Sequence, residues 1–184
     1  MNTVVTSKEE ILAQCRALVM EKGLSAINMR TVASACGVAV GSIYNYFPSK
    51  ADLIYAAVED VWKDIFHMSG SCFSFTHFTD CLRWLFESIR RGCEKYPGFF
   101  TLHSVSAAGD KSVGLELMER YTGHIRQNLV QVLINDPDIR PDAFNEILTP
   151  EVFIEMIFTL VTSMLLNNQW DCRPLLEMAA HSIY

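Results

Sequence analysis

The sequence predicts an all-α protein, and three observations lead to this prediction. Apolar residues recur at helical spacing along most of the 184 residues, no run alternates as a surface strand would, and turn-rich segments separate the periodic stretches. About nine helices account for the pattern. The expected organisation is a three-helix head over residues 1–50, joined by a long helix to a helical body over residues 51–184.

The head begins with two helices whose ends are marked by capping residues. Ser7 followed by Glu10 has the spacing of a capping box, so the first helix starts after Ser7. Gly23 is expected to end it. Asn28 then caps a second, short helix, and Gly37 ends that helix because glycine adopts the left-handed conformation at little cost.

The third and fourth helices are separated by a single break. A short helix is expected over residues 39–46, and Pro48 prevents it from continuing. Ser49 caps a long fourth helix over residues 50–67.

The body is expected to contain five further helices, separated by turn-forming segments such as Pro97-Gly98 and residues 135–142. The predicted ranges are 77–95, 99–108, 112–134, 150–168 and 173–183. The helix over residues 150–168 is apolar nearly all round, so it must be covered on more than one side.

A homodimer would cover the apolar helix over residues 150–168. Pairing it and the following helix with their copies gives a four-helix bundle. The alternative is that this helix is a central core helix of a single chain. The residues predicted for the dimer interface are Phe153, Ile157, Leu160, Met164, Leu176 and Ala180.

Charge is distributed unevenly along the chain. The formal net charge is −6, which argues against a generally basic nucleic-acid binder. Residues 1–50, however, carry five basic and three acidic side chains, whereas residues 51–184 carry ten basic and eighteen acidic. A mildly basic head on an acidic body is compatible with DNA binding by the head alone.

The stretch "CGVAVGSIYNYFPSK" over residues 36–50 has the features of a helix-turn-helix. Two short helices are joined by "GVAV", and in this motif the second helix lies in the DNA major groove. Gly41 and Ser42 are small enough for a close approach to DNA. The hydroxyls of Tyr44 and Tyr46 can donate to phosphate oxygens, and Lys50 adds a cation at the start of the next helix.

The segment "GLSAINMRTVASACGVAVGSIYNYFPSKADLI" over residues 23–54 resembles the DNA-binding head of the TetR family of bacterial transcriptional regulators. The resemblance implies a dimeric, ligand-responsive regulator, most often a repressor, that binds a two-fold symmetric double-stranded operator. The residues expected to serve DNA binding are Asn28, Arg30, Gly41, Ser42, Tyr44, Asn45, Tyr46 and Lys50.

The recognition helix departs from the family pattern at its start. Ala39 stands where a serine normally caps the helix, and Val40 stands where a polar or basic residue is frequent. The missing cap costs about 1 kcal/mol. With fewer polar groups at these positions, the candidates for base contact are Arg30, Ser42, Tyr44 and Asn45.

The resemblance also implies an effector site in the body. The fourth to seventh helices carry many large aromatic residues with a few polar groups, which is typical of small-molecule sites and also of helical cores. The candidate pocket residues are Trp62, Phe66, Trp84, His103, Met118 and Tyr121. A small apolar effector, uncharged or cationic, suits a body with this acidic excess.

Other functional classes find little support. The sequence contains no nucleophile elbow, zinc-protease motif or phosphate loop. We therefore expect no enzymatic activity, no cofactor and no metal. The six cysteines form no CxxC pair and are expected to be small core residues. No signal peptide or membrane-spanning run is found, so a cytoplasmic location is expected. The alternative function is a helical dimeric interaction protein that has lost DNA binding.

Overall fold

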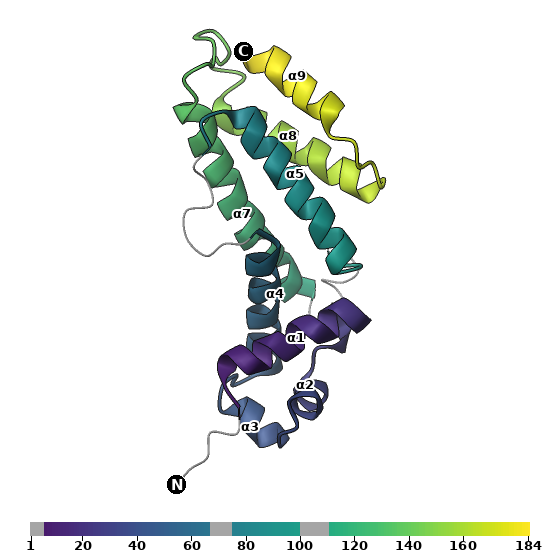
Figure 1. Cartoon of the computed structure of the whole chain (residues 1–184). Helices are drawn as coiled ribbons and strands as arrows, with labels where there is room; N and C mark the ends of the chain where they lie inside the picture. The colour runs from purple at the N-terminus through teal and green to yellow at the C-terminus, as the bar shows by residue number, and fades with distance from the viewer. Residues whose placement is uncertain (1–5, 67–74, 100–110) are drawn as a thin grey trace. The chain divides into compact units, whose positions relative to one another are not determined.

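The computed structural model of the chain describes residues 6–66, 75–99 and 111–184, apart from the side chains of residues 111–121. The described residues form eight α-helices and one short 3₁₀ turn and contain no strand, which confirms the all-α class (Figure 1). The helix predicted over residues 99–108 falls almost entirely outside them. No helix in these ranges has the length and apolar content needed to span a membrane.

Contacts between Cα atoms divide the chain into two compact units. Unit 1 comprises Met1–Met68 and Arg91–Leu117, and unit 2 comprises Ser69–Arg90 and Met118–Tyr184. The unit that contains the head extends past residue 50, because the long fourth helix packs against the first. The predicted division at residue 50 separates two functions, and it does not coincide with a boundary between the compact units. It stays a prediction.

Unit 1 contains the helices of the predicted head and the helix that follows them. In chain order they are α1 (Lys8–Lys22), η1 (Leu24–Ala26), α2 (Met29–Cys36), α3 (Val40–Tyr44) and α4 (Lys50–Phe66). α1 contacts α2 and α4, and α2 contacts α3. The cysteine of α1, Cys15, is fully buried, and this burial raises the pKa of its thiol to about 12. Such a thiol is an inert core residue.

Local capping signals set the helix ends in unit 1. The backbone N–H of Glu10 donates to Ser7 Oγ at 3.1 Å, and the N–H of Ser7 donates to Glu10 Oε2 at 2.8 Å, so the predicted capping box is formed. Gly23 ends α1 with φ of 76°. Ser49 Oγ accepts from the N–H of Asp52 at 3.2 Å at the start of α4.

Unit 2 contains most of α5 (Phe78–Lys95), most of α7 (Lys111–Asn135), and all of α8 (Pro150–Leu166) and α9 (Arg173–Ile183). Thr149 caps α8 by accepting from the N–H of Val152 at 3.3 Å, as the Thr-Pro sequence suggests. Aromatic residues form part of the core: the Phe153 ring lies 6.0 Å from Phe78 and 5.9 Å from Phe144.

Asp136 organises one end of unit 2. Its buried carboxylate accepts from the N–H of Phe78 at 2.7 Å, from the hydroxyl of Tyr184 at 2.5 Å and from the N–H of Asp138 at 3.0 Å. Burial alone would raise the pKa of this carboxyl, but the hydrogen bonds outweigh it and lower the pKa. One side chain thus caps α5 and fixes the last residue of the chain.

Candidate DNA-binding site

The turn between α2 and α3 has the backbone conformation that a helix-turn-helix requires. Gly37 ends α2 with φ of 66°, in the left-handed region, and its N–H donates to the carbonyl of Ser34 at 3.2 Å. The N–H of Val38 donates to the carbonyl of Ala33 at 3.0 Å. A side chain at position 37 would be strained by this conformation, so the predicted role of Gly37 is confirmed.

Buried side chains hold α3 against the rest of the head. Ile43 is completely buried and Phe47 is 2% exposed, and Val32 and Ala33 of α2 are buried as well. Because these residues point inward, the other face of α3 is turned to solvent. Val40 and Tyr44 lie there with 36% and 50% of their surface exposed.

Most residues predicted to contact DNA lie on the surface of the head. Exposed positions are Arg30, Gly41, Tyr44, Asn45, Tyr46 and Lys50, and half-buried positions are Asn28 and Ser42. Among the described residues neither Arg30 nor Lys50 forms an ion pair. Both cations are therefore available to a phosphate or a base edge in this part of the chain.

Asn28 performs a structural task in the head. Its Oδ1 accepts from the N–H groups of Arg30 at 3.1 Å and Thr31 at 3.0 Å, and its amide donates to Thr31 Oγ1 at 2.7 Å. These bonds are those of the predicted N-cap. Asn28 supports the first turn of α2, in which Arg30 lies.

Tyr46 is engaged in a bond that the sequence did not reveal. Its hydroxyl donates to the backbone carbonyl of Thr6 at 2.6 Å, a residue forty positions away. A tyrosine hydroxyl has one proton, so donation to a phosphate would require this bond to break. In this structure Tyr46 ties the segment before α1 to the end of the recognition helix, and Lys8 lies 5.7 Å from the neighbouring Phe47 ring.

A polar network connects α1, α4 and the end of α5 within unit 1. Arg16 of α1 forms an ion pair with Asp60 of α4. One turn further along α4, Asp64 accepts from Lys95 Nζ at 2.7 Å and from the Tyr96 hydroxyl at 2.8 Å. Burial opposes ionisation of Asp64, but these hydrogen bonds prevail and lower its pKa.

Gly92 brings α5 close to α4 at the same place. A Cβ added at Gly92 would lie 3.0 Å from side-chain atoms of Ile65, which is closer than ordinary packing allows. This end of α5 is therefore in direct contact with α4, which begins at Lys50.

The six predicted effector residues do not line a described pocket. Trp62 and Phe66 are buried in unit 1, with stacked rings 5.3 Å apart and Phe99 at 6.0 Å from Trp62. Trp84 lies in unit 2, 5.6 Å from Phe75. His103 and the side chains of Met118 and Tyr121 lie outside the described residues.

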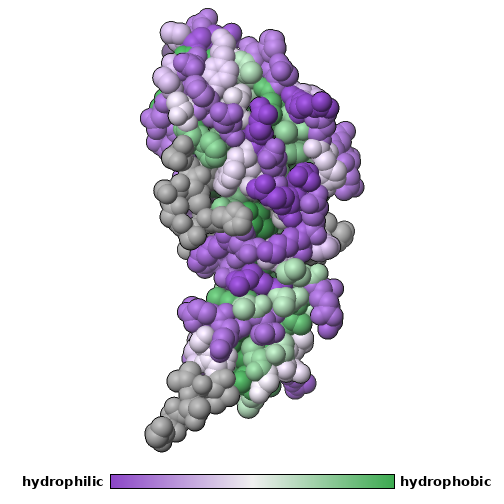
Figure 2. Space-filling view, viewed as in Figure 1, coloured by the Kyte–Doolittle hydropathy of each residue, from purple (hydrophilic) through white to green (hydrophobic). Residues whose placement is uncertain are grey.

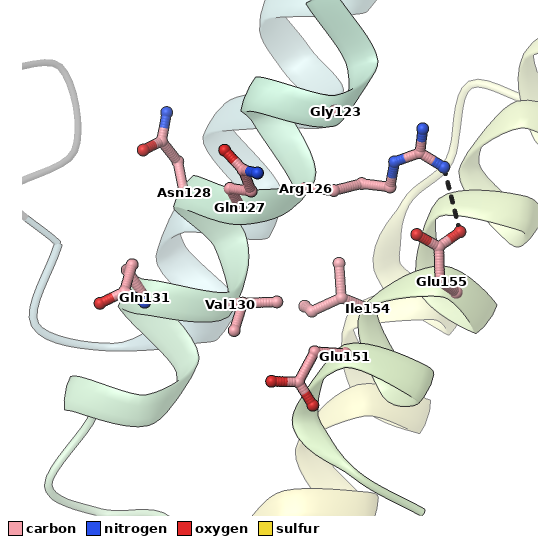
Figure 3. A pocket seen from close by; sticks show the side chains of 9 residues that line it. All are labelled: Gly123, Arg126, Gln127, Asn128, Val130, Gln131, Glu151, Ile154 and Glu155. Atoms are coloured by element: carbon pink, nitrogen blue, oxygen red, sulfur yellow. Dashed lines mark hydrogen bonds and ion pairs between the residues drawn. The ribbon is translucent and has the colours of Figure 1, made fainter. Parts of the chain in front are cut away.

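One described pocket is an open groove of about 670 Å³ between α7 and α8. Figure 3 shows Arg126 of α7 extending toward Glu155 of α8, with an Nη1–Oε2 distance of 3.1 Å, while Val130 and Ile154 face each other below. Six of its nine lining residues carry amide or charged side chains. None of the predicted effector residues belongs to it.

A second pocket, of about 520 Å³, lies between α8 and α9 and is mainly apolar. It is lined by Leu160, Met164, Gln169, Trp170, Asp171, Pro174, Leu175 and Met178. Two of these residues, Leu160 and Met164, were predicted for the dimer interface.

The structure separates the predicted interface residues of α8 and α9 into two groups. Phe153, Ile157 and Leu176 are buried within the chain itself, so a second copy cannot reach them. Leu160 is 39% exposed, and Met164 and Ala180 are half-buried. Further exposed apolar positions of these helices, which the prediction did not name, are Val152, Met156, Leu166 and Met178.

One cluster in unit 2 has the composition of a metal site. His77 Nδ1 lies 3.5 Å from an oxygen of Asp136 and 3.5 Å from an oxygen of Asp138. Both oxygens of Asp136 already accept hydrogen bonds from the protein. The cluster is accounted for by its role in capping α5 and holding the C-terminus.

Comparison with known proteins agrees with this geometry. The profile of the family described as "Bacterial regulatory proteins, tetR family" matches residues 7–57. Over 51 residues the chain is 43% identical to the HTH-type transcriptional repressor KstR of Rhodococcus jostii strain RHA1, a match covering 28% of this chain and 24% of the repressor. KstR of Mycobacterium tuberculosis strain H37Rv is 41% identical over 51 residues, which are 28% of this chain and 23% of that protein.

A solved structure resembles the whole chain in fold. The multidrug binding protein EbrR, crystallised with imidazole, superposes with a TM-score of 0.62 and 18% sequence identity over 100% of this chain and 94% of EbrR. The sequence matches to the KstR repressors span only about a quarter of their length, and they coincide with the head that contains the α2–Gly37–α3 turn. Residues 7–57 of the chain are therefore similar to the tetR family of bacterial regulatory proteins.

Proposed function

We propose that the protein is a DNA-binding transcriptional regulator, acting as a repressor that a small-molecule effector releases from its operator. The observation that carries this proposal is the α2–Gly37–α3 geometry, with buried Ile43 and Phe47 fixing the recognition helix. Arg30 and Lys50 flank this helix as exposed cations. They supply the phosphate attraction on which DNA binding depends.

The proposed active form is a homodimer joined through α8 and α9. Val152, Met156 and Leu160 are spaced four residues apart on α8, and they are 43%, 55% and 39% exposed. This stripe is continuous with the apolar groove lined by Met164 and Met178. An apolar helix face of this length is stabilised when a second copy covers it, and two-fold symmetry then requires two operator half-sites.

The proposed effector region lies in the body, residues 51–184, with residues 1–50 as the DNA-binding part. Trp62 and Phe66 of α4 form a buried aromatic cluster with Phe99, and this cluster is the proposed apolar part of the effector region. EbrR, which has a similar fold, is described as a multidrug binding protein, and this supports a small-molecule effector. Trp84, His103, Met118 and Tyr121 stay sequence-based candidates for contact with an effector.

The route from effector to DNA runs along α4. The bonds of Asp64 to Lys95 and Tyr96, together with the close Gly92–Ile65 contact, join the end of α5 to α4. A ligand that shifts this end alters the position of the recognition helix in each copy. It releases DNA only to the extent that it binds the shifted shape more tightly, typically by about 1–3 kcal/mol.

The test is selection of binding sites from random double-stranded DNA with the full chain, followed by anisotropy titration of the enriched duplex. The expected result is an inverted repeat bound far more tightly than a scrambled duplex. Typical specific binding exceeds non-specific binding by about 10³-fold or more. Enrichment of no sequence would refute the proposal and favour an interaction protein that does not bind DNA.

A further inference from the structure

The first turn of the recognition helix presents an apolar surface to solvent. Ala39 is exposed and makes no side-chain cap, Val40 is 36% exposed, and Gly41 has open space around it. Ser42, which is half-buried, is the only polar side chain from 39 to 42. Figure 2 shows apolar surface on the visible face of the head near α2 and α3.

This turn is held in place from beneath. The N–H of Ser42 donates to the carbonyl of Ala39 at 2.9 Å, and Ile43 anchors the helix in the core. Valine is branched at Cβ and loses little further side-chain freedom when it is covered. Val40 therefore offers two methyl groups at a fixed position on the DNA-facing side of the head.

The chemistry of the major groove leaves one partner for these methyl groups. The N-terminal residues of a recognition helix contact base edges, and thymine alone among the four bases carries a methyl group there. Every base edge presents hydrogen-bonding atoms that valine cannot satisfy, but guanine, adenine and cytosine add no methyl group that valine could cover. Contact with them would leave polar groups without partners.

We propose that Val40 is a specificity-determining residue that recognises the 5-methyl group of a thymine in each operator half-site. The inference rests on the proposed DNA binding and specifies one feature of the sequence that is bound. Arg30 and Asn45 remain available for hydrogen bonds to neighbouring bases, because both are exposed on the same helix-turn-helix.

Replacing thymine by uracil in DNA tests this contact directly, because the exchange removes only the methyl group and keeps base pairing. Each thymine of the selected operator is replaced by deoxyuridine, symmetrically in the two half-sites, and binding is measured by anisotropy. At one symmetric position affinity should fall about fourfold for each methyl group removed, and so about fifteenfold for the pair, as expected for the loss of one methylene-sized contact in each half-site. The ratio of the affinities for the thymine and uracil duplexes should be the same at two salt concentrations, since no phosphate contact is lost.

Val40→Ala connects the effect to this side chain. The variant should bind the thymine operator as weakly as the wild type binds the uracil operator, and it should no longer distinguish the two duplexes. Met20→Ala is the matched control: Met20 is an apolar residue of α1, 44% exposed, and lies outside the helix-turn-helix. Met20→Ala should keep the wild-type ratio of the affinities for the thymine and uracil duplexes. Circular dichroism verifies that both variants are folded.

The outcomes separate this inference from the proposed function. If a specific operator is bound but no thymine-to-uracil exchange weakens the wild type, the thymine contact is refuted while DNA regulation stands. Equal loss of affinity for both duplexes in Val40→Ala would also overturn it, since Val40 would then act through helix stability. Absence of any specific DNA binding would refute the proposed function itself. The comparison of thymine and uracil duplexes uses the wild-type protein, so it does not depend on how the variants fold.

Discussion

α3 and α8 both expose apolar side chains, yet their surroundings assign them to different partners. The exposed turn of α3 is short and flanked by Arg30 and Lys50, whereas the stripe of α8 runs from Val152 to Leu160 beside Glu151 and Glu155. Glu151 repels a phosphate backbone and Glu155 is paired with Arg126, whereas the two cations beside α3 attract phosphate. Exposed apolar surface alone therefore does not identify a partner, but its length and the charge around it do.

The largest effect is expected on the inward face of α8. Phe153→Glu places a carboxylate against Phe78 and Phe144 in the core of unit 2. We expect a loss of more than about 4 kcal/mol in the free energy of unfolding, because the charge is buried without a partner and the aromatic packing is lost. Chemical denaturation followed by circular dichroism measures it, and a stable, folded variant would contradict the burial of this residue.

Leu160→Glu on the outward face of α8 should dissociate the dimer and leave the chain folded. Leu160 is 39% exposed in the single chain, so the charge meets water until a second copy covers it. Sedimentation equilibrium at micromolar concentration should give a dimer for the wild type and a monomer for the variant. Thr162→Glu, at another exposed position of α8, serves as the control for adding a charge to this helix. A monomeric wild type would refute the proposal that a second copy of the chain covers the apolar stripe of α8.

Each unit contains a carboxylate whose pKa is lowered, Asp64 in unit 1 and Asp136 in unit 2. A lowered folded pKa means that the stabilisation is present above the ordinary value of 3.8 and is lost as pH falls through the folded value. Asp64→Asn should cost about 1–2 kcal/mol at pH 7, since Lys95 loses its ionic partner, and this difference should vanish in strong acid. Urea titrations from pH 7 to pH 2 test this, and a cost that does not change with pH would contradict the assignment.

A smaller effect is expected from the cations beside α3. Lys50→Ala should weaken binding to all DNA sequences by a similar factor and reduce the slope of log affinity against log salt by about 0.9, because one phosphate contact is lost. Lys22→Ala, an exposed lysine at the end of α1, should leave the slope unchanged. An unchanged slope in Lys50→Ala would show that Lys50 does not contact phosphate. It would also weaken the contrast between the basic surroundings of α3 and the acidic surroundings of α8.

The features that could be predicted from the sequence depend on neighbours along the chain. The Ser7–Glu10 capping box, the Asn28 cap and the left-handed Gly37 each involve residues within one helical turn. Capping and turn preferences are strong at that range, so the α2–α3 motif and nearly all helix limits were predictable.

The features that could not be predicted depend on residues far apart in the chain. The Tyr46 hydroxyl bonds to Thr6, and Asp136 bonds to Phe78, which is 58 residues away, and to Tyr184, 48 residues away. An aspartate in a turn-rich segment and a tyrosine beside a recognition helix both have more obvious local explanations. Periodicity likewise showed that α8 is apolar nearly all round. It could not show which face of α8 is covered by other helices of the same chain.

The central claim is that two copies, joined through α8 and α9, present two α3 helices to one operator. Sedimentation velocity of the selected duplex with a slight excess of protein tests it, using the full inverted repeat and a duplex with one half-site scrambled. The account predicts two chains on the full repeat and a large loss of affinity for the scrambled duplex. A single chain bound to the full repeat, with affinity unchanged when one half-site is scrambled, would contradict it.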